Sequence, residues 1–243
     1  MRFRTWLSRN LPQPLKTALG RAIFGNIRRV GTIDFGDFGR SRPINRHFGY
    51  HRGTPIDRFY IESFLASHAN DIRGRVLEVG DAIYSRRFGS GVTHQHVLHV
   101  DEQAEATIVG DLSREGVLPD EAFDCIIVAQ TLHLIYDMRA AIAQLERALK
   151  PGGVALVTVP GVSSVDAGEW GGSWCWALTA HSAALLFGES FDDRGLAVQA
   201  FGNVYAATCF LQGLALEDVD RRLLSYRDKC YPVTVTIRAR KAP

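Results

Sequence analysis

Acidic side chains in the middle of the chain stand at spacings that suit a nucleoside ligand. Glu78 and Gly80 end a short apolar run, and Asp101 follows 23 residues after Glu78. An acid about 20 residues beyond the first loop of an α/β unit is placed to hydrogen-bond two ribose hydroxyls. Asp111 and Leu112 end a third run, where a carboxylate can accept from an exocyclic amine and a leucine can pack on a base. The pattern predicts a nucleoside site lined with carboxylates.

The loop after Glu78 discriminates between nucleoside cofactors. A dinucleotide site uses G-x-G-x-x-G so that the backbone can approach a pyrophosphate. Here the loop reads Gly80-Asp81-Ala82-Ile83-Tyr84-Ser85, with one glycine and an acid beside it. Asp81 would repel a pyrophosphate, whereas S-adenosylmethionine (SAM) has no phosphate and carries a positive sulfonium. The loop therefore favours SAM over NAD(P).

The elements that must position these residues alternate between strand and helix. We expect short apolar strands at 75–79, 96–100, 107–109, 124–129 and 154–159, which implies a parallel sheet covered by helices. A helix is expected at 56–68, and another from an Asp137 N-cap to Leu149, ended by Pro151-Gly152-Gly153. The last third predicts strands at 197–201 and 233–237, with a mostly helical segment at 205–226 between them.

Residues 74–160 resemble the core of the class I SAM-dependent methyltransferases. The matching segments are VLEVGD at 76–81, HVD at 99–101, GDL at 110–112, FDCIIVAQTLHLI at 123–135 and LKPGGVALVTVP at 149–160. The flanks resemble a bacterial subgroup often seen with glycosyltransferases, through RGTPIDRFYIESFL at 52–65, WGGSW at 170–174 and GNVYAA at 202–207.

The resemblance implies an α/β, Rossmann-like fold: a mostly parallel seven-stranded sheet with helices on both faces and an antiparallel last strand. It also implies roles by position. Glu78 and Gly80 would lie by the methionine part of SAM, Asp101 would hold the ribose, Asp111 and Leu112 would hold the adenine, and Gln130 would face the cofactor. The family loop has two further glycines where Ala82 and Tyr84 stand here. That departure leaves an alternative open, a catalytically degenerate SAM-fold protein that serves in binding or assembly.

Other residues are candidates for contact with a methyl acceptor. His133 follows the fourth strand and could take a proton from a substrate hydroxyl, or could simply pack or cap. Trp170 and Trp174 lie in a glycine-flanked loop that could stack on a sugar, or could pack as a lid. Tyr60 lies in the expected cap helix, which could close over SAM or could be a surface helix with an apolar inner face.

Some classes of site are disfavoured. No metal site is expected, because His94 and His96 share one face of a strand while His99 lies on the other. Nucleic acid is not the expected partner, because the sequence after the fourth strand lacks the motifs of DNA methylation. The four cysteines form no CxxC pair, which favours a reduced, cytoplasmic location.

Charge is distributed unevenly along the chain. Residues 1–52 carry a net charge of +9 and the remainder −7, within a total of +2. A basic arm can face phosphate, a membrane surface or an acidic partner, or can be a solvated leader. We expect a basic N-terminal arm and cap at 1–55 and a methyltransferase domain at 56–243. The expected activity is methyl transfer from SAM to a small-molecule or carbohydrate-type acceptor, at oxygen.

Overall fold

The computed structural model describes residue 12 and residues 32–243. Most of the basic arm lies outside the described residues, so its contact with a membrane surface or a partner stays a prediction. The chain forms two compact units, residues 1–41 and 42–243. In the described part of the first, a single 3-10 turn, η1 (Gly36–Phe38), begins where the Gly36 amide donates to Asp34 Oδ1 at 2.8 Å. A domain boundary after residue 55 also stays a prediction.

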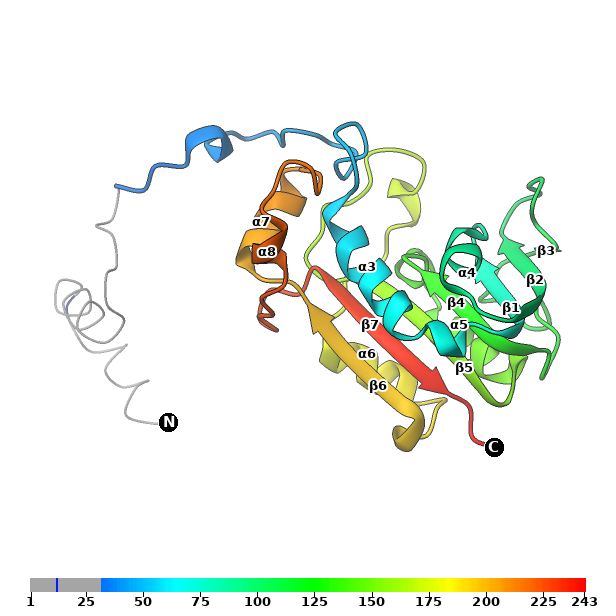
Figure 1. Ribbon diagram of the computed structural model, residues 1–243. Coiled ribbons are helices and arrows are strands. Elements are labelled where there is room, and N and C mark those ends of the chain that lie inside the picture. The colour runs from blue at the N-terminus through cyan, green and yellow to red at the C-terminus, as the bar shows by residue number, and fades with distance from the viewer. Residues whose placement is uncertain (1–11, 13–31) are drawn as a thin grey trace. The chain divides into compact units, whose positions relative to one another are not determined.

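Residues 42–243 are built on one seven-stranded sheet with the strand order β3-β2-β1-β4-β5-β7-β6 (Figure 1). Pairing is parallel from β3 through to β5, and β7 is antiparallel to both of its neighbours. The strands are β1 (Gly74–Val79), β2 (Val92–His99), β3 (Ile108–Val109), β4 (Phe123–Ala129), β5 (Leu149–Pro160), β6 (Leu196–Phe201) and β7 (Thr234–Arg240). This is the predicted fold class. Strand order reverses between β1 and β4, where ligands bind in such sheets.

Helices cover both faces of the sheet, as predicted. They are α3 (Ile56–Ser67), α4 (Ile83–Phe88), α5 (Met138–Ala148), α6 (Ala180–Gly188), α7 (Val204–Leu211) and α8 (Arg221–Leu224). Successive strand residues point to opposite faces, so Leu77 and Ile126 pack in the cluster with α5 and α6, while Val76 and Ile127 pack in the cluster with α3 and α4. Figure 1 shows α3 across one face and α6 behind the other.

Helix boundaries follow local capping. The predicted N-cap at Asp137 is confirmed, because its Oδ1 accepts from the Ala140 amide at 3.1 Å. The prediction of a mostly helical 205–226 is wrong in its middle, since residues 212–220 are not helical. The chain leaves α7 through Gly213, whose φ of +67° is left-handed, and a Cβ there would lie 2.0 Å from the Asn45 carbonyl oxygen. Glycine is therefore required at this position.

The close approach at Gly213 belongs to a segment that we call the strap, residues 45–55. The strap runs beside the loop after α7: the Asn45 amide donates to the Gln212 carbonyl at 3.0 Å, and the Leu216 amide to the Thr54 carbonyl at 2.7 Å. Arg52 adds a two-pronged contact to the Asp218 carboxylate at 2.7 and 2.8 Å. Two segments distant in sequence are thus joined at the carboxyl end of the sheet.

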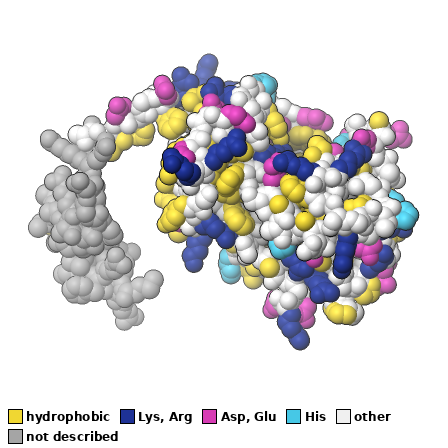
Figure 2. All heavy atoms as spheres, in the orientation of Figure 1, with side chains coloured by type: hydrophobic (Ala, Val, Ile, Leu, Met, Phe, Trp, Pro, Cys, Tyr) yellow, Lys and Arg dark blue, Asp and Glu magenta, His cyan; other side chains and the backbone are white. Residues whose placement is uncertain are grey.

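On the face shown in Figure 2, basic, acidic and hydrophobic side chains are interspersed. None of the helices in the described ranges has the length and apolar run needed to span a bilayer.

Candidate functional site

A cavity of about 1090 Å³ opens at the carboxyl ends of β1, β2 and β4. The strap and the first turn of α3 form part of its wall, and the loop after β5 forms another part. Ligand sites typically measure about 300–1,000 Å³, so this cavity has room for a cofactor and an acceptor together. The fold places it beside the point where strand order reverses, as the sequence predicts.

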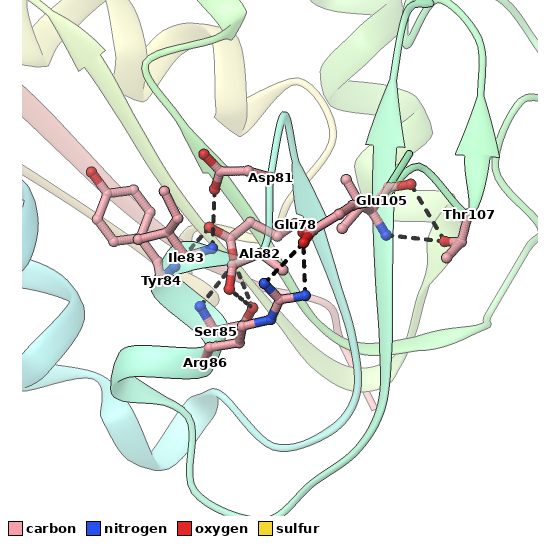
Figure 3. Close-up of polar contacts among 10 residues, drawn as sticks. Glu78, Asp81, Ala82, Ile83, Tyr84, Ser85, Arg86, Glu105 and Thr107 are labelled. Atoms are coloured by element: carbon pink, nitrogen blue, oxygen red, sulfur yellow. Dashed lines mark hydrogen bonds and ion pairs between the residues drawn. The ribbon is translucent and has the colours of Figure 1, made fainter. Parts of the chain in front are cut away.

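At the end of β1, Glu78 organises the loop that follows (Figure 3). The side chain is buried, and its Oε1 accepts from the Tyr84 amide at 2.9 Å. Its Oε2 accepts from the Ser85 amide at 2.8 Å and from Ser85 Oγ at 2.5 Å. Burial raises the pKa of Glu78, against the effect of these hydrogen bonds. Glu78 lines the cavity, but its carboxylate is engaged in holding the start of α4.

Tyr84 stands where the family loop has a glycine, and it links this loop to α3. Its hydroxyl accepts from Arg58 Nη1, while Arg58 Nη2 donates to the Tyr50 hydroxyl at 2.6 Å. Burial raises the pKa of Tyr84 to about 12. Burial lowers the pKa of Arg58, but Asp57 and the two tyrosine oxygens outweigh it, so the guanidinium pKa is raised overall. The side chains that line the cavity here are Tyr50, Asp57, Arg58 and Tyr84.

Asp57 precedes Arg58 on the same turn of α3. Its Oδ1 is shielded from solvent and has no hydrogen-bond partner within residues 32–243. Burial raises the pKa of Asp57, partly offset by the Arg58 charge. A buried acceptor without a donor costs roughly 1–3 kcal/mol, so a ligand donor at this point would relieve an existing penalty.

The predicted adenine and ribose residues lie along the neighbouring strands. Asp111 and Leu112 line the cavity after β3. Asp111 Oδ1 accepts from the Ser113 amide at 2.9 Å and its hydroxyl at 2.7 Å, and these bonds lower the pKa of Asp111. Asp101 is exposed and does not line the cavity, although the preceding Val100 does. Its carboxylate makes no hydrogen bond or ion pair within residues 32–243.

Gln130 enters the cavity wall at the end of β4 with an unusual backbone. Its φ is +51°, in the left-handed region that residues other than glycine rarely adopt. The Gln130 amide donates to the Thr158 carbonyl at 2.9 Å, so pairing with β5 fixes the position of the turn. Residues held in such conformations cluster at ligand sites.

The opposite part of the cavity is aromatic and contains His133, in the 3-10 turn η3 (Leu132–Leu134). The residue is 2% exposed, its Nδ1 is shielded from solvent without a hydrogen-bond partner among the described residues, and burial lowers its pKa to about 4. Because Nδ1 is shielded, Nε2 is the ring nitrogen that a ligand could reach. The Trp174 ring meets it edge to face with centroids 4.3 Å apart, and Phe48 stacks on Trp174 at 6.0 Å. His133 is therefore a neutral imidazole beside an aromatic wall.

Backbone contacts hold this wall in place. The His133 carbonyl accepts from the amides of Cys175 and Trp176 at 3.0 and 3.1 Å. These bonds join η3 to residues 170–176, which we call the tryptophan loop. Trp170 also lines the cavity, and its amide donates to Asp166 Oδ2 at 3.0 Å. Tyr60 does not reach the cavity: its ring is 2% exposed and its hydroxyl donates to the Leu224 carbonyl at 3.0 Å.

Sequence reasoning missed part of the wall. Phe48, Tyr50 and Phe210 line the cavity, as does Arg58. Phe48 and Tyr50 lie in a stretch punctuated by glycine that carries no periodic pattern, and Phe210 lies in a helix far along the chain. Their common signal is tertiary, because only pairing of the strap with the loop after α7 brings them over the sheet.

Carboxylates outnumber guanidiniums along the cavity. The acids on its wall are Asp57, Glu62, Glu78, Asp81, Asp111, Asp137 and Asp166; the guanidiniums are Arg58 and Arg114. Arg58 is bound by two tyrosines, and Arg114 lies 3.7 Å from Asp111. The resulting negative potential suits a cation. SAM fits these residues: it is cationic, its nucleoside can meet Asp111 after β3, and Asp57 Oδ1 offers an acceptor for which the described residues supply no donor.

Comparison with known proteins agrees with this geometry. Solved structures similar to the chain include an S-adenosylmethionine-dependent methyltransferase from Mesorhizobium loti, with 16% identity over 76% of this chain and 100% of that chain, at a TM-score of 0.52. Another is a SAM-dependent methyltransferase from Archaeoglobus fulgidus, with 11% identity over 76% and 94%, at 0.50. A third is the [4+2]-cyclase SpnF, with 18% identity over 82% and 88%, at 0.50. At these identities the likeness concerns the fold.

The comparison with curated proteins gives no match. The model of one family, described as a methyltransferase domain, matches residues 41–199, which is well over half of the chain. The matched span includes the strap, the loops that follow β1, β2 and β3, the tryptophan loop and part of β6. The chain belongs to this methyltransferase family, and it is a SAM-dependent methyltransferase.

Proposed function

We propose that the enzyme methylates a hydroxyl oxygen of a small-molecule or carbohydrate-type acceptor that carries no negative charge. The observation that carries this proposal is the aromatic half of the cavity, where neutral His133 lies against Trp174 and Phe48. Aromatic faces stack on the apolar faces of sugar rings, and a neutral imidazole accepts from a hydroxyl. The aromatic side chains would hold and orient the acceptor, and His133 Nε2 would accept its hydroxyl proton.

The chemistry requires little of the base. When bound, SAM supplies a methyl group activated by its sulfonium. The acceptor oxygen would form a bond to the methyl carbon as the bond from that carbon to sulfur breaks, and His133 Nε2 would accept the hydroxyl proton. An oxygen that is gaining a methyl group becomes strongly acidic, so an imidazole with a pKa of about 4 is basic enough to receive the proton. Proximity and alignment supply most of the remaining rate enhancement.

The cavity's charges restrict the acceptor class. Its carboxylates outnumber its guanidiniums, and Asp166 places one of these carboxylates on the tryptophan side. A phosphate or carboxylate on the acceptor would meet this mainly negative wall, which disfavours anionic compounds. We therefore expect a neutral sugar residue or small alcohol rather than a sugar phosphate.

We also propose the cofactor roles that the resemblance implies. Asp101 would hold the ribose, Asp111 and Leu112 the adenine, and Gly80 and Gln130 would approach the cofactor through the backbone. Asp101→Ala should weaken SAM binding by about 10- to 100-fold, in line with the ~1.5–3 kcal/mol of a hydrogen bond to a charged group. Titration calorimetry measures this, and unchanged affinity would remove the ribose assignment.

Paired acceptors test the proposed activity. Each neutral glycoside or alcohol is assayed beside its phosphorylated counterpart, and methyl transfer from labelled SAM is counted. We expect turnover with members of the neutral series and little with their phosphates. Consistently higher kcat/KM for the phosphates would overturn the acceptor class. The family assignment supports an active enzyme over the degenerate alternative, and an association with glycosyltransferases stays a prediction.

A further inference from the structure

The amides at the start of α4 are already occupied in this protein. The Ile83 amide donates to Asp81 Oδ1 at 3.0 Å, and the amides of Tyr84 and Ser85 donate to Glu78 (Figure 3). A helix N-terminus can bind a carboxylate only through free amides. The amino-acid end of SAM carries a carboxylate and an ammonium, so neither this helix start nor the Glu78 carboxylate is free to hold it.

Two side chains of opposite charge reach the cavity wall from the first turn of α3. Asp57 presents Oδ1, which is shielded from solvent and has no donor in the described part of the chain. Arg58 follows it, and its two terminal nitrogens each donate to one tyrosine hydroxyl. A guanidinium has five N–H groups, so most of its donors remain available. Arg58 is joined to the β1–α4 loop through Tyr84, so this pair of charges borders the loop that the resemblance assigns to methionine.

We propose that Asp57 and Arg58 recognise the amino-acid end of the cofactor, Asp57 Oδ1 accepting from its ammonium and Arg58 donating to its carboxylate. Adjacent charges of opposite sign complement a zwitterion, and charge-assisted hydrogen bonds are about twice as strong as neutral ones. The inference rests on the cofactor assignment and is independent of the acceptor.

Tyr84 gains a function in this arrangement. With Tyr50 it fixes the Arg58 guanidinium from two separate segments, the start of α4 and the strap. The tyrosine in place of a family glycine would thus be a positioning residue for the arginine that holds the carboxylate. Its hydroxyl carries this role, so Tyr84→Phe should resemble a weak form of the Arg58 variant.

Calorimetric titration with three ligands distinguishes the contribution of Asp57 to binding from that of Arg58, and it needs no acceptor. SAM has both groups, decarboxylated SAM keeps the ammonium alone, and 5′-methylthioadenosine lacks the whole amino-acid end. Asp57→Asn should weaken SAM and decarboxylated SAM alike, by about tenfold or more. Arg58→Gln should weaken SAM by a similar factor and leave decarboxylated SAM nearly unchanged. Tyr84→Phe should follow the Arg58→Gln pattern with a smaller loss.

Binding of 5′-methylthioadenosine reports whether the nucleoside part of the site is intact, and it should be unchanged in all three variants. Arg86→Gln is the matched control, because it makes the same change as Arg58→Gln at an exposed arginine of α4 that does not line the cavity and pairs with Glu105. It should bind all three ligands like the parent. Equal losses for SAM and 5′-methylthioadenosine in Asp57→Asn, or an unchanged preference for SAM over decarboxylated SAM in Arg58→Gln, would overturn the proposal.

Discussion

His133 is a histidine that burial keeps neutral. Its ring is buried, and no described residue hydrogen-bonds Nδ1 to stabilise a positive charge, so the pKa falls from about 6.5 to about 4. A neutral imidazole is ready to accept a proton across the physiological pH range. The same depression links folding to pH, since the unfolded chain binds a proton between these two values and the folded chain does not.

The first prediction concerns this residue. His133→Gln should lower kcat by about 10²-fold while SAM affinity stays within twofold. Between pH 6 and 9 the wild-type kcat should show no inflection due to His133, because its pKa lies below that window. An inflection near pH 6.5 that disappears in the variant would contradict the neutral imidazole, and an unchanged kcat would assign His133 to packing.

The second prediction is the stability effect of the same group. A depressed folded pKa contributes stability that is present above about pH 6.5 and is lost as pH falls towards 4. The loss amounts to at most about 3 kcal/mol from the shift. Urea unfolding at pH 7 and pH 4.5 should show a smaller decline for His133→Gln than for the wild type. Equal declines would mean that the ring is protonated in the folded protein.

The backbone of Gln130 gives the third prediction. A β-branched residue at a φ of +51° is strained, so Gln130→Val should lower the free energy of unfolding by about 1–3 kcal/mol. Gln130→Gly removes the same side chain without that strain and should be close to neutral. Denaturant midpoints measure the difference. If valine and glycine proved equally stable, the turn would not be confined to the left-handed region.

At the scale of elements, what the sequence could predict follows from how local each signal is. β1 and β4 were predictable from short runs of apolar residues. α5 was predictable from its N-cap, the helical spacing of its apolar residues and the Pro-Gly-Gly that follows it. Glu78, Asp111 and Gln130 follow such strands directly, so their approach to the cavity could be anticipated. Phe48 and Tyr50 belong to the strap, whose position depends on backbone pairing with residues more than 150 positions away. No local pattern encodes such a pairing.

The fourth prediction tests the strap as an element. Gly213→Ala would place a Cβ 2.0 Å from the Asn45 carbonyl oxygen at a left-handed backbone, so it should destabilise the protein by about 2 kcal/mol or more. Arg52→Ala breaks only a partly exposed ion pair and should cost at most about 1 kcal/mol. Thermal unfolding separates them. A Gly213→Ala protein as stable as the wild type would show that the strap and this loop separate freely.

At the scale of the whole molecule, the chain divides its charge between two parts. The first 52 residues carry +9, while the carboxylates that line the cavity all lie after residue 52. An acidic cavity suits a cationic cofactor and disfavours anionic acceptors, whereas a basic arm attracts anionic surfaces. The two roles need opposite charges, so we infer that the arm does not serve cofactor binding. The arm would instead hold the enzyme at an anionic surface or help to bind the acceptor.

The last prediction separates the arm from the strap by truncation. A chain beginning at Arg42 loses only the first compact unit and keeps every described residue that lines the cavity. It should unfold at the same denaturant concentration as the full chain and bind SAM within about twofold. A chain beginning at Ile56 also loses the strap, with Phe48, Tyr50 and the Arg52 contact to Asp218, and it should bind SAM at least tenfold more weakly.

The full chain should in turn bind vesicles containing anionic lipid more tightly than the chain from Arg42. The difference should shrink as salt is raised, because screening weakens exposed charges. Loss of SAM binding in a folded chain from Arg42 would place the arm in the cofactor site, and equal vesicle binding by the two chains would remove the membrane role.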